Sequence, residues 1–191
     1  FHLANTDVTL AEGATFENFA LTTGARLARN ELETRLTGAG ATSILNGAYL
    51  IRGKQHADTT TLTRHLVAET DSRQVYKGIL DEEAHGVFQG KIQIVKDAQK
   101  VAGDQLSRAL LLSDTAHVAV KPELEIHADD VKCSHGASSG ELDEDALFYL
   151  QSRGIEAKAA RKMLIDAFLA DVLEEVSNEA VRAYFADVTA R

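Results

Sequence analysis

SRQVYKGILDEEAHGVFQGKIQI, residues 72–94, contains two short apolar runs separated by an acidic turn. The β-branched and aromatic residues of each run are typical of a β-strand. Each run also carries an internal glycine, Gly78 in the first and Gly90 in the second. A glycine inside a strand indicates a bend or a close approach of other parts of the chain. The stretch therefore predicts two consecutive short strands in a closely packed β-structure.

Similar runs recur from the N-terminus to about residue 135, at intervals of roughly 10 to 16 residues, with Gly, Asp, Asn and Lys in the turns. They cover residues 32–36, 44–51, 59–67, 75–80, 87–95, 106–112, 118–120, 124–126 and 131–133. This spacing suits a sandwich, a barrel or a parallel β-helix, and periodicity alone does not choose among them. The internal glycines and the near-absence of helical signals favour stacked coils.

After Gly140 the apolar period changes to that of helices. Asp143 is predicted to cap a helix over 144–153, with Asp145 in its first turn and Gly154 at its end. A longer helix is expected over 156–175, and Ser177 or Asn178 is predicted to cap a last one. The stripe of the long helix comprises Ala159, Ala160, Met163, Leu164, Ala167, Phe168, Val172 and Val176. We predict a β-domain over 1–138 and a small helical domain over 139–191, with apolar stripes packed on one another and on the β-domain.

The composition is that of a globular protein, with 45% hydrophobic and 26% charged residues among 191. No apolar run approaches the roughly 20 residues that span a bilayer. A net charge of −9 disfavours nucleic acid and anionic lipid as partners and favours a protein or a cation. A single cysteine excludes an internal disulfide and is compatible with a reducing, cytoplasmic location. The start at Phe1, without an initiator Met or a signal segment, predicts a fragment truncated on its N-terminal side.

One pair of side chains suggests metal or cluster chemistry. In an extended segment the Cys133 thiol and the His135 imidazole project from the same face, so two soft ligands would lie side by side. A closed metal site needs about four ligands, and no second cysteine is present. Any further ligands must therefore come from elsewhere. The sequence predicts that five other histidines, at 56, 65, 85, 117 and 127, are mostly turn or surface residues, although His127 could approach the same rim.

Enzyme motifs are absent from the sequence. Neither a Gly-x-Ser-x-Gly elbow nor a phosphate-binding loop occurs, so any ATP use must belong to a partner. A carbohydrate-active β-helix would need paired carboxylates and aromatic platforms. Carboxylates are present at Asp129, Asp130, Glu141 and Asp143, but there is no Trp. We interpret these acids as solvated turns and helix caps.

Six blocks, in order, resemble one known family. They are SRQVYKGIL (72–80), GVFQGKIQI (86–94), KDAQKVAGDQLSRALLLS (96–113), KPELEI (121–126), DDVKCSHGA (129–137) and LFYLQSRGI (147–155). Together they are similar to the SufB/SufD family of the SUF iron–sulfur cluster assembly machinery. Their sequences resemble its SufD members more than its SufB members. The resemblance covers most of residues 44 to 176, and it implies a right-handed parallel β-helix followed by the helical unit.

The resemblance also implies a function. The chain would be a non-catalytic scaffold that acts with a SufB-like paralogue and a SufC-like ATPase in cluster assembly and iron acquisition. No cofactor would be tightly bound; iron or an iron–sulfur cluster would be held transiently, shared with SufB. His135 is then the better candidate at the SufB interface and Cys133 the secondary one. The SufC-binding region would comprise Leu147, Phe148, Tyr149, Arg153 and Gly154.

By analogy with the family, ATP-driven dimerisation of SufC would pull on the helices and open the SufB–SufD interface. The sequence leaves two alternatives open. One is a purely structural adaptor or dimerisation module, and the other is a carbohydrate-active β-helix enzyme. A homodimer is also possible when the partner is absent, because a terminal coil offers unpaired strand edges.

Overall fold

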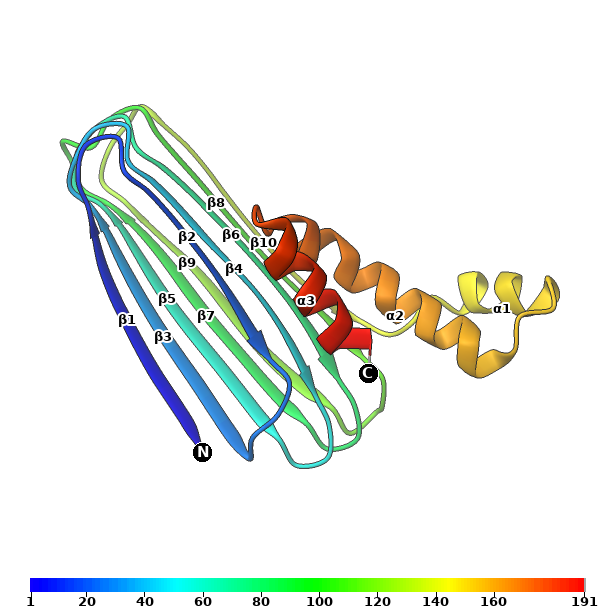
Figure 1. The fold of residues 1–191 in the computed structure, drawn as a ribbon. Coiled ribbons are helices and arrows are strands. Elements are labelled where there is room, and N and C mark those ends of the chain that lie inside the picture. Colours follow the sequence, from blue (N-terminus) through cyan, green and yellow to red (C-terminus); the bar gives the residue numbers. More distant parts are fainter. Residues whose placement is uncertain (191) are drawn as a thin grey trace.

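A computed structural model describes residues 1–190, and Figure 1 shows a stack of long parallel strands with helices on one side. The strands in these residues are β1 (His2–Leu10), β2 (Thr15–Thr22), β3 (Leu27–Leu36), β4 (Thr42–Ile51), β5 (His56–His65), β6 (Asp71–Leu80), β7 (His85–Ile94), β8 (Val101–Leu111), β9 (His117–Ile126) and β10 (Val131–Gly140). The helices that follow are α1 (Glu144–Ser152), α2 (Ala157–Glu174) and α3 (Glu179–Ala190).

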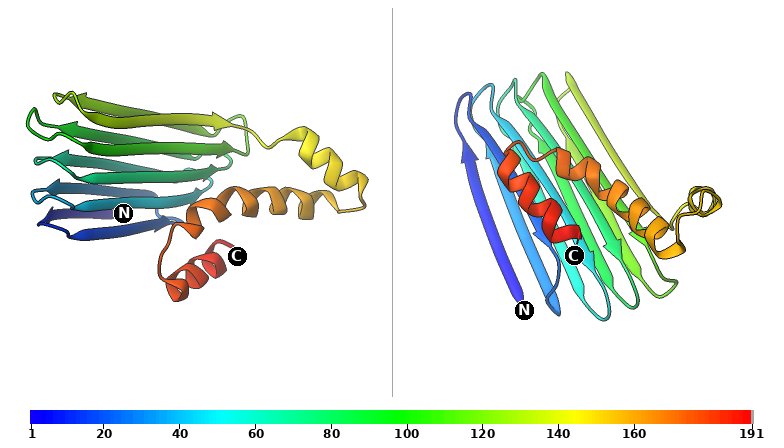
Figure 2. Two further views of the ribbon diagram at one scale, coloured as in Figure 1. Left: turned by 90° about the horizontal axis from the view of Figure 1, so that it is seen from above. Right: turned by 45° about the vertical axis from the view of Figure 1, so that its right-hand side comes forward.

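The strands alternate between two parallel sheets. Sheet A has the order β1-β3-β5-β7-β9, and sheet B has the order β10-β8-β6-β4-β2. Each coil contributes one strand to each sheet, so residues in equivalent places of successive coils are 26 to 32 positions apart. The left view of Figure 2 shows these coils as layers stacked one on another. The predicted parallel β-helix with a C-terminal helical part is confirmed.

Several strand boundaries differ from the sequence prediction. The runs 118–120 and 124–126 belong to one strand, β9, which continues through Pro122. A proline without an N–H is tolerated there because β9 is the edge strand of sheet A. β10 extends well beyond Cys133, to Gly140, and β1 and β2 have no counterpart among the predicted runs. The second half of β10 contains glycine, alanine and serine in place of large apolar residues. An edge strand buries fewer of its side chains, so it needs fewer apolar residues.

Inside the solenoid, large side chains fit against glycines of the neighbouring strand. Tyr49 of β4 is paired in register with Gly78 of β6, and Tyr76 of β6 with Gly47 of β4. A Cβ atom at Gly78 would lie 2.1 Å from the Tyr49 ring, and one at Gly47 would lie 2.6 Å from the Tyr76 ring. Both tyrosines are buried. The prediction that internal glycines permit close approach is therefore confirmed.

Replacing Gly78 with Ala should destabilise the protein, because the added methyl group overlaps the buried Tyr49 ring. Overpacking of this kind costs about 1–3 kcal/mol in the free energy of unfolding. The measurement is urea denaturation of the variant beside Gly140→Ala, a strand glycine with nothing within 4 Å of its added Cβ. Equal stability of the two variants would contradict the close-packing argument.

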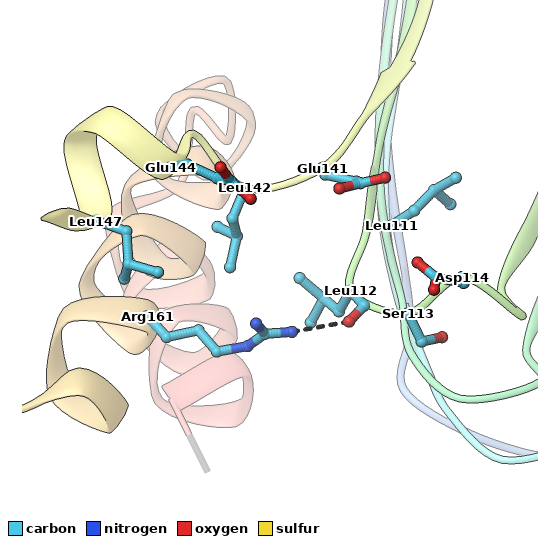
Figure 3. Close-up of a pocket in the computed structure, with 9 residues that line it drawn as sticks. All are labelled: Leu111, Leu112, Ser113, Asp114, Glu141, Leu142, Glu144, Leu147 and Arg161. Atoms are coloured by element: carbon cyan, nitrogen blue, oxygen red, sulfur yellow. Dashed lines mark hydrogen bonds between the residues drawn. The ribbon is translucent and has the colours of Figure 1, made fainter.

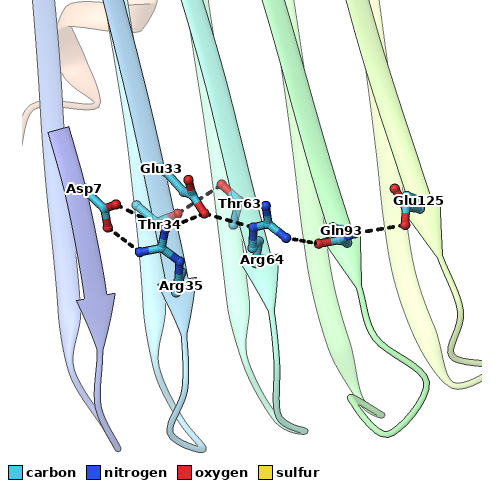
Figure 4. Close-up of polar contacts among 8 residues, drawn as sticks. All are labelled: Asp7, Glu33, Thr34, Arg35, Thr63, Arg64, Gln93 and Glu125. Atoms are coloured by element: carbon cyan, nitrogen blue, oxygen red, sulfur yellow. Dashed lines mark hydrogen bonds and ion pairs between the residues drawn. The ribbon is translucent and has the colours of Figure 1, made fainter. Parts of the chain in front are cut away.

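On the outer face of sheet A, a polar ladder crosses all five strands (Figure 4). Its contacts are Asp7 with Arg35, Arg35 with Glu33 at 2.8 Å, Glu33 with Arg64 at 2.9 Å, Arg64 with Gln93 at 2.8 Å and Gln93 with Glu125 at 2.9 Å. Charged side chains on a solvated sheet face keep it from aggregating, and networks contribute more than isolated surface pairs. The ladder marks this face as solvated and polar.

The helices follow the predicted caps. The Asp143 carboxylate accepts a hydrogen bond from the Ala146 N–H at 3.0 Å, and the Asn178 amide oxygen accepts one from the Val181 N–H at 3.1 Å. Gly154 follows α1 with φ at +86°, which glycine adopts without strain. The division into domains over 1–138 and 139–191 stays a prediction, and its last residue, Arg191, lies outside the described residues.

Helix α2 docks on the outer face of sheet B (Figure 2). Leu169, Val172 and Leu173 pack there against residues of β4, β6 and β8. The side chain of Lys77 is only 4% exposed, and its Nζ donates to the Phe168 carbonyl at 2.6 Å and to Asp171 Oδ2 at 2.7 Å. A buried ammonium needs such partners, so this contact fixes the position of the helix on the sheet.

The predicted apolar stripe of the long helix is partly wrong. Ala160, Val172 and Val176 are buried as expected, but Met163 is 48% exposed and Ala159 and Ala167 are also exposed. Leu169 and Leu173, which the stripe omitted, are buried instead. The reason is that the sheet, and not the helix period alone, selects the face that docks.

Within residues 1–190, no helix is both long enough and apolar enough to cross a membrane.

Candidate functional site

The last coil of the solenoid carries the two predicted ligands. Each of its two strands lies at an edge, β9 in sheet A and β10 in sheet B. On β10, Cys133 is in register with Gly103 of β8, and His135 is in register with Gln105. Cys133 packs on buried residues of the interior, so it points inward, and strand alternation places His135 on the same inner face. The expected same-face arrangement is therefore present.

The Cys133 thiol is half-buried among the apolar side chains of β7 and the corner before β8. Burial raises its pKa, the nearby Asp104 carboxylate raises it further, and a backbone hydrogen bond from Gly103 opposes both. The thiol is therefore held in its protonated form, and thiolate is the form that binds metal. Metal binding at Cys133 would have to displace this proton.

His135 is exposed, and its ring makes no hydrogen bond or ion pair with any residue of the described part, 1–190. An imidazole without a competing partner is free to bind a metal ion. The absence of a fixing contact also means that no second group in the described chain orients the ring. His135 therefore offers an accessible ligand whose orientation is left to a bound ion or a partner.

Beside His135 lies a residue that the sequence reasoning missed, Gln105. Its side chain is 2% exposed, and neither its amide nitrogen nor its oxygen has a hydrogen-bond partner in residues 1–190. A Cβ atom at Gly90 would lie 1.4 Å from Gln105 Nε2, so Gly90 makes room for this amide. The sequence signal for this residue was a polar glutamine at a position of β8 that faces the interior. Recognising that position required knowledge of the strand register. Buried polar groups of this kind normally bind water or a ligand.

The described residues do not complete a metal site. In 1–190, no group of three or more His, Cys, Asp or Glu side chains is arranged to hold an ion. His127 does not join the pair; its Nε2 lies 3.1 Å from Glu125 Oε1. The prediction that the remaining histidines are mostly turn or surface residues is wrong for His65, which is fully buried between Thr70 and Ser72.

The predicted SufC-binding residues lie on or beside α1, which projects away from the solenoid (Figure 2). Phe148 and Tyr149 are 74% and 56% exposed. The Arg153 guanidinium lies over the Tyr149 ring at 5.1 Å and donates to its hydroxyl at 3.0 Å. Gly154 forms the turn after the helix. Phe148, Tyr149 and Arg153 therefore form an exposed aromatic and cationic surface, which we call the α1 surface.

Leu147 instead faces the junction between helices and solenoid. The residue lines a hollow with a volume of about 140 Å³. Figure 3 shows its side chain near those of Leu142, Leu112 and Arg161. There Arg161 donates a hydrogen bond to the Leu112 carbonyl at 2.9 Å. Three acids, Asp114, Glu141 and Glu144, also line the hollow. The hollow is small, and its contacts join the two parts of the chain.

Comparisons with known proteins agree with this architecture. Residues 1–168 match the family described as SUF system FeS cluster assembly, SufBD core domain. The chain is 37% identical over 181 residues to the iron-sulfur cluster assembly protein SufD of Escherichia coli, covering 95% of this chain and 43% of that protein. It is 33% identical over 162 residues to the protein of the same name from Bacillus subtilis, covering 85% and 37%.

A third relative is protein ABCI7, chloroplastic, of Arabidopsis thaliana, 35% identical over 182 residues and covering 95% of this chain and 38% of that protein. The chain thus spans about two fifths of the length of these relatives. Because one relative is chloroplastic by name, family membership does not assign a cellular compartment. The match to the core domain and the relatives named SufD together show that this chain belongs to the SufB/SufD family of the SUF iron–sulfur cluster assembly system.

Proposed function

We propose that this chain is part of a non-catalytic scaffold subunit, in which His135 and Cys133 contribute to a transient iron–sulfur assembly site shared with a SufB-like paralogue. The observation that carries the proposal is an exposed, unpartnered imidazole beside a half-buried thiol on the open last coil. Iron and the nascent cluster are cargo in this scheme. A site divided between two subunits can build a cluster and release it, whereas a closed four-ligand site would retain it.

His135 is the principal ligand in this proposal. It is accessible, whereas Cys133 must first lose a proton that its surroundings favour. The partner supplies the remaining ligands, because a thiol and an imidazole are two of the about four that iron or zinc requires. The unpartnered Gln105 amide beside them offers hydrogen bonds to whatever fills the site.

The partner would dock on the free edges of the last coil. Within residues 1–190, β9 and β10 have a paired strand on one side only. Unpaired strand edges bind other strands through their main-chain hydrogen bonds. The SufB-like subunit would occupy these edges, and in its absence a second copy of this chain could do so. A net charge of −9 supports a protein partner over nucleic acid or a membrane.

The α1 surface would recruit the SufC-like ATPase. Exposed aromatic side chains with an adjacent arginine are the residues enriched at protein interfaces. Helix α2 links this surface to the solenoid and is held by Lys77 and Asp171. Movement of the ATPase could therefore be transmitted to sheet B through a fixed contact.

Two other readings have less support. The relatives are named as assembly proteins, which supports a non-enzymatic role. The carbohydrate-active alternative has no structural support, because Asp143 caps α1 and Glu141 lines the junction hollow. A purely structural adaptor, in which SufB holds all ligands, is the alternative that cluster content can test.

We place the complex in the cytoplasm, or in the equivalent compartment of an organelle.

The experiment uses the full-length protein copurified anaerobically with its SufB-like and SufC-like partners. We expect His135→Ala to lose most of the iron, acid-labile sulfide and cluster absorbance while the complex elutes intact. Cys133→Ser should lose less. His127→Ala is the matched control on the same coil, because its ring is paired with Glu125, and it should keep its cluster. Unchanged cluster content in His135→Ala would overturn the proposed site and leave the adaptor reading.

A further inference from the structure

Three histidines form one row on the outer face of sheet A. His56, His85 and His117 are the first residues of β5, β7 and β9. The register pairs His56 with His85 and His85 with His117. Their ring centroids are 6.2 Å apart in the first pair and 5.2 Å apart in the second. Residues that the sequence places far apart are thus brought together by the stacking of coils.

The rings of this row are free to bind a ligand. His85 and His117 are exposed, and His56 is partly exposed. In the described residues, none of the three rings makes a hydrogen bond or an ion pair, and their contacts are with one another. Two other histidines near these strands do have partners. His65 of β5 is buried between hydroxyls, and His127, just after β9, is paired with Glu125. The neutral histidine imidazole is the commonest metal ligand in proteins.

The two pairs differ in geometry. When two imidazoles bind one tetrahedral ion through nitrogens at about 2.0–2.1 Å, their ring centres lie about 5 Å apart and their planes are inclined. His85 and His117 match this, with centroids 5.2 Å apart and planes inclined by 52°. His56 and His85 are nearly parallel, at 10°, and farther apart, as in a simple stack. The second pair is therefore the one that can share an ion.

We propose that His85 and His117 together bind a divalent transition-metal ion of the kind that prefers imidazole, such as Zn²⁺, Cu²⁺ or Ni²⁺, with water filling the other positions. β7 is paired with strands on both sides, which holds the two histidine backbones in place. With two protein ligands the site binds reversibly, and His56 is a flanking ring. No group of three ligands is present in residues 1–190, in keeping with this open site.

This site is separate from the Cys133 and His135 pair. His117 begins β9, and Cys133 lies near the start of β10. Successive strands of the solenoid run between opposite turns, so the two sites lie at opposite ends of the last coil and on different sheets. The row is also on the outer face, whereas Cys133 points inward. The inference therefore stands independently of the proposed assembly function.

The test uses the full-length protein carrying Cys133→Ser and His135→Gln, which removes the other soft ligands. Calorimetric titration with Zn²⁺ should show one site, and His85→Gln or His117→Gln should each weaken binding by about tenfold or more, because each removes one of two ligands. His56→Gln and His127→Gln should leave the dissociation constant unchanged, because neither ring belongs to the inclined pair. Circular dichroism verifies that each variant is folded.

A second readout identifies the ligands directly. With one equivalent of Cu²⁺, the electron paramagnetic resonance spectrum should show coupling to two imidazole nitrogens, and to one in His117→Gln. Absence of Zn²⁺ binding, or binding unaffected by both His85→Gln and His117→Gln, would overturn the proposal. Variants that lower thermal stability without changing Zn²⁺ affinity would likewise overturn it and leave a row of rings that only stack.

Discussion

Replacing Phe88 with Ala should lower the free energy of unfolding by about 3–5 kcal/mol, the range for removing a fully buried aromatic side chain. Phe88 is completely buried on the inner face of β7. It contacts the Tyr76 ring at a centroid distance of 4.7 Å and packs with Leu32, Leu45 and, on the last coil, Val120. Its loss would leave a cavity between both sheets, directly beneath the coil that carries His135.

The measurement is thermal and urea unfolding of the wild type and Phe88→Ala. For a chain of this size, each kcal/mol lowers Tm by about 2–4 °C, so a fall of roughly 6–20 °C is expected. Gln89→Ala is the control, because its side chain points out from the same strand into solvent, and such changes stay within about 0.5 kcal/mol. A Phe88→Ala variant as stable as Gln89→Ala would mean that the coils do not depend on this cluster.

Acidification from pH 6.5 to pH 4 should remove about 3 kcal/mol of stability through His65, which corresponds to its pKa shift. Burial lowers the pKa of His65 to about 4, and both ring nitrogens contact hydroxyls, Thr70 Oγ1 at 2.7 Å and Ser72 Oγ at 2.9 Å. In the unfolded chain histidine binds a proton near pH 6.5. Between these values the unfolded state takes up a proton that the folded state excludes, so stability falls as pH falls.

The free energy of unfolding should be measured in urea at pH 7.5, 6 and 5. The His65 contribution at pH 5 is a loss of about 2 kcal/mol, and His65→Gln should not show it, although that variant starts from lower stability. Gln89→Ala, which removes no titratable group, should retain the wild-type slope. Glu125, whose pKa is lowered to about 2, loses its contribution as the pH falls below its ordinary pKa of 4.5, and the three measured pH values lie above this. Identical pH slopes in the wild type and His65→Gln would contradict the buried, neutral state of His65.

Local features of the chain were predictable because they depend on neighbouring residues. The glycines at 78 and 90 indicated close approach, and each is opposed by a bulky or polar side chain. Asp143 was recognisable as a helix cap from its position alone. The pairing of Cys133 and His135 on one face followed from strand alternation, a property of the backbone.

The sequence by itself determined the change from strands to helices after Gly140, the cap of α1 at Asp143 and the face shared by Cys133 and His135. Only the tertiary structure decided that Leu169 and Leu173 would dock α2, that Gln105 would lie beside His135 and that His56, His85 and His117 would form a row. These outcomes depend on the register between coils, which joins residues 26 to 32 positions apart. Alternation and helix period act over a few residues, whereas the register is set by the packing of the whole interior.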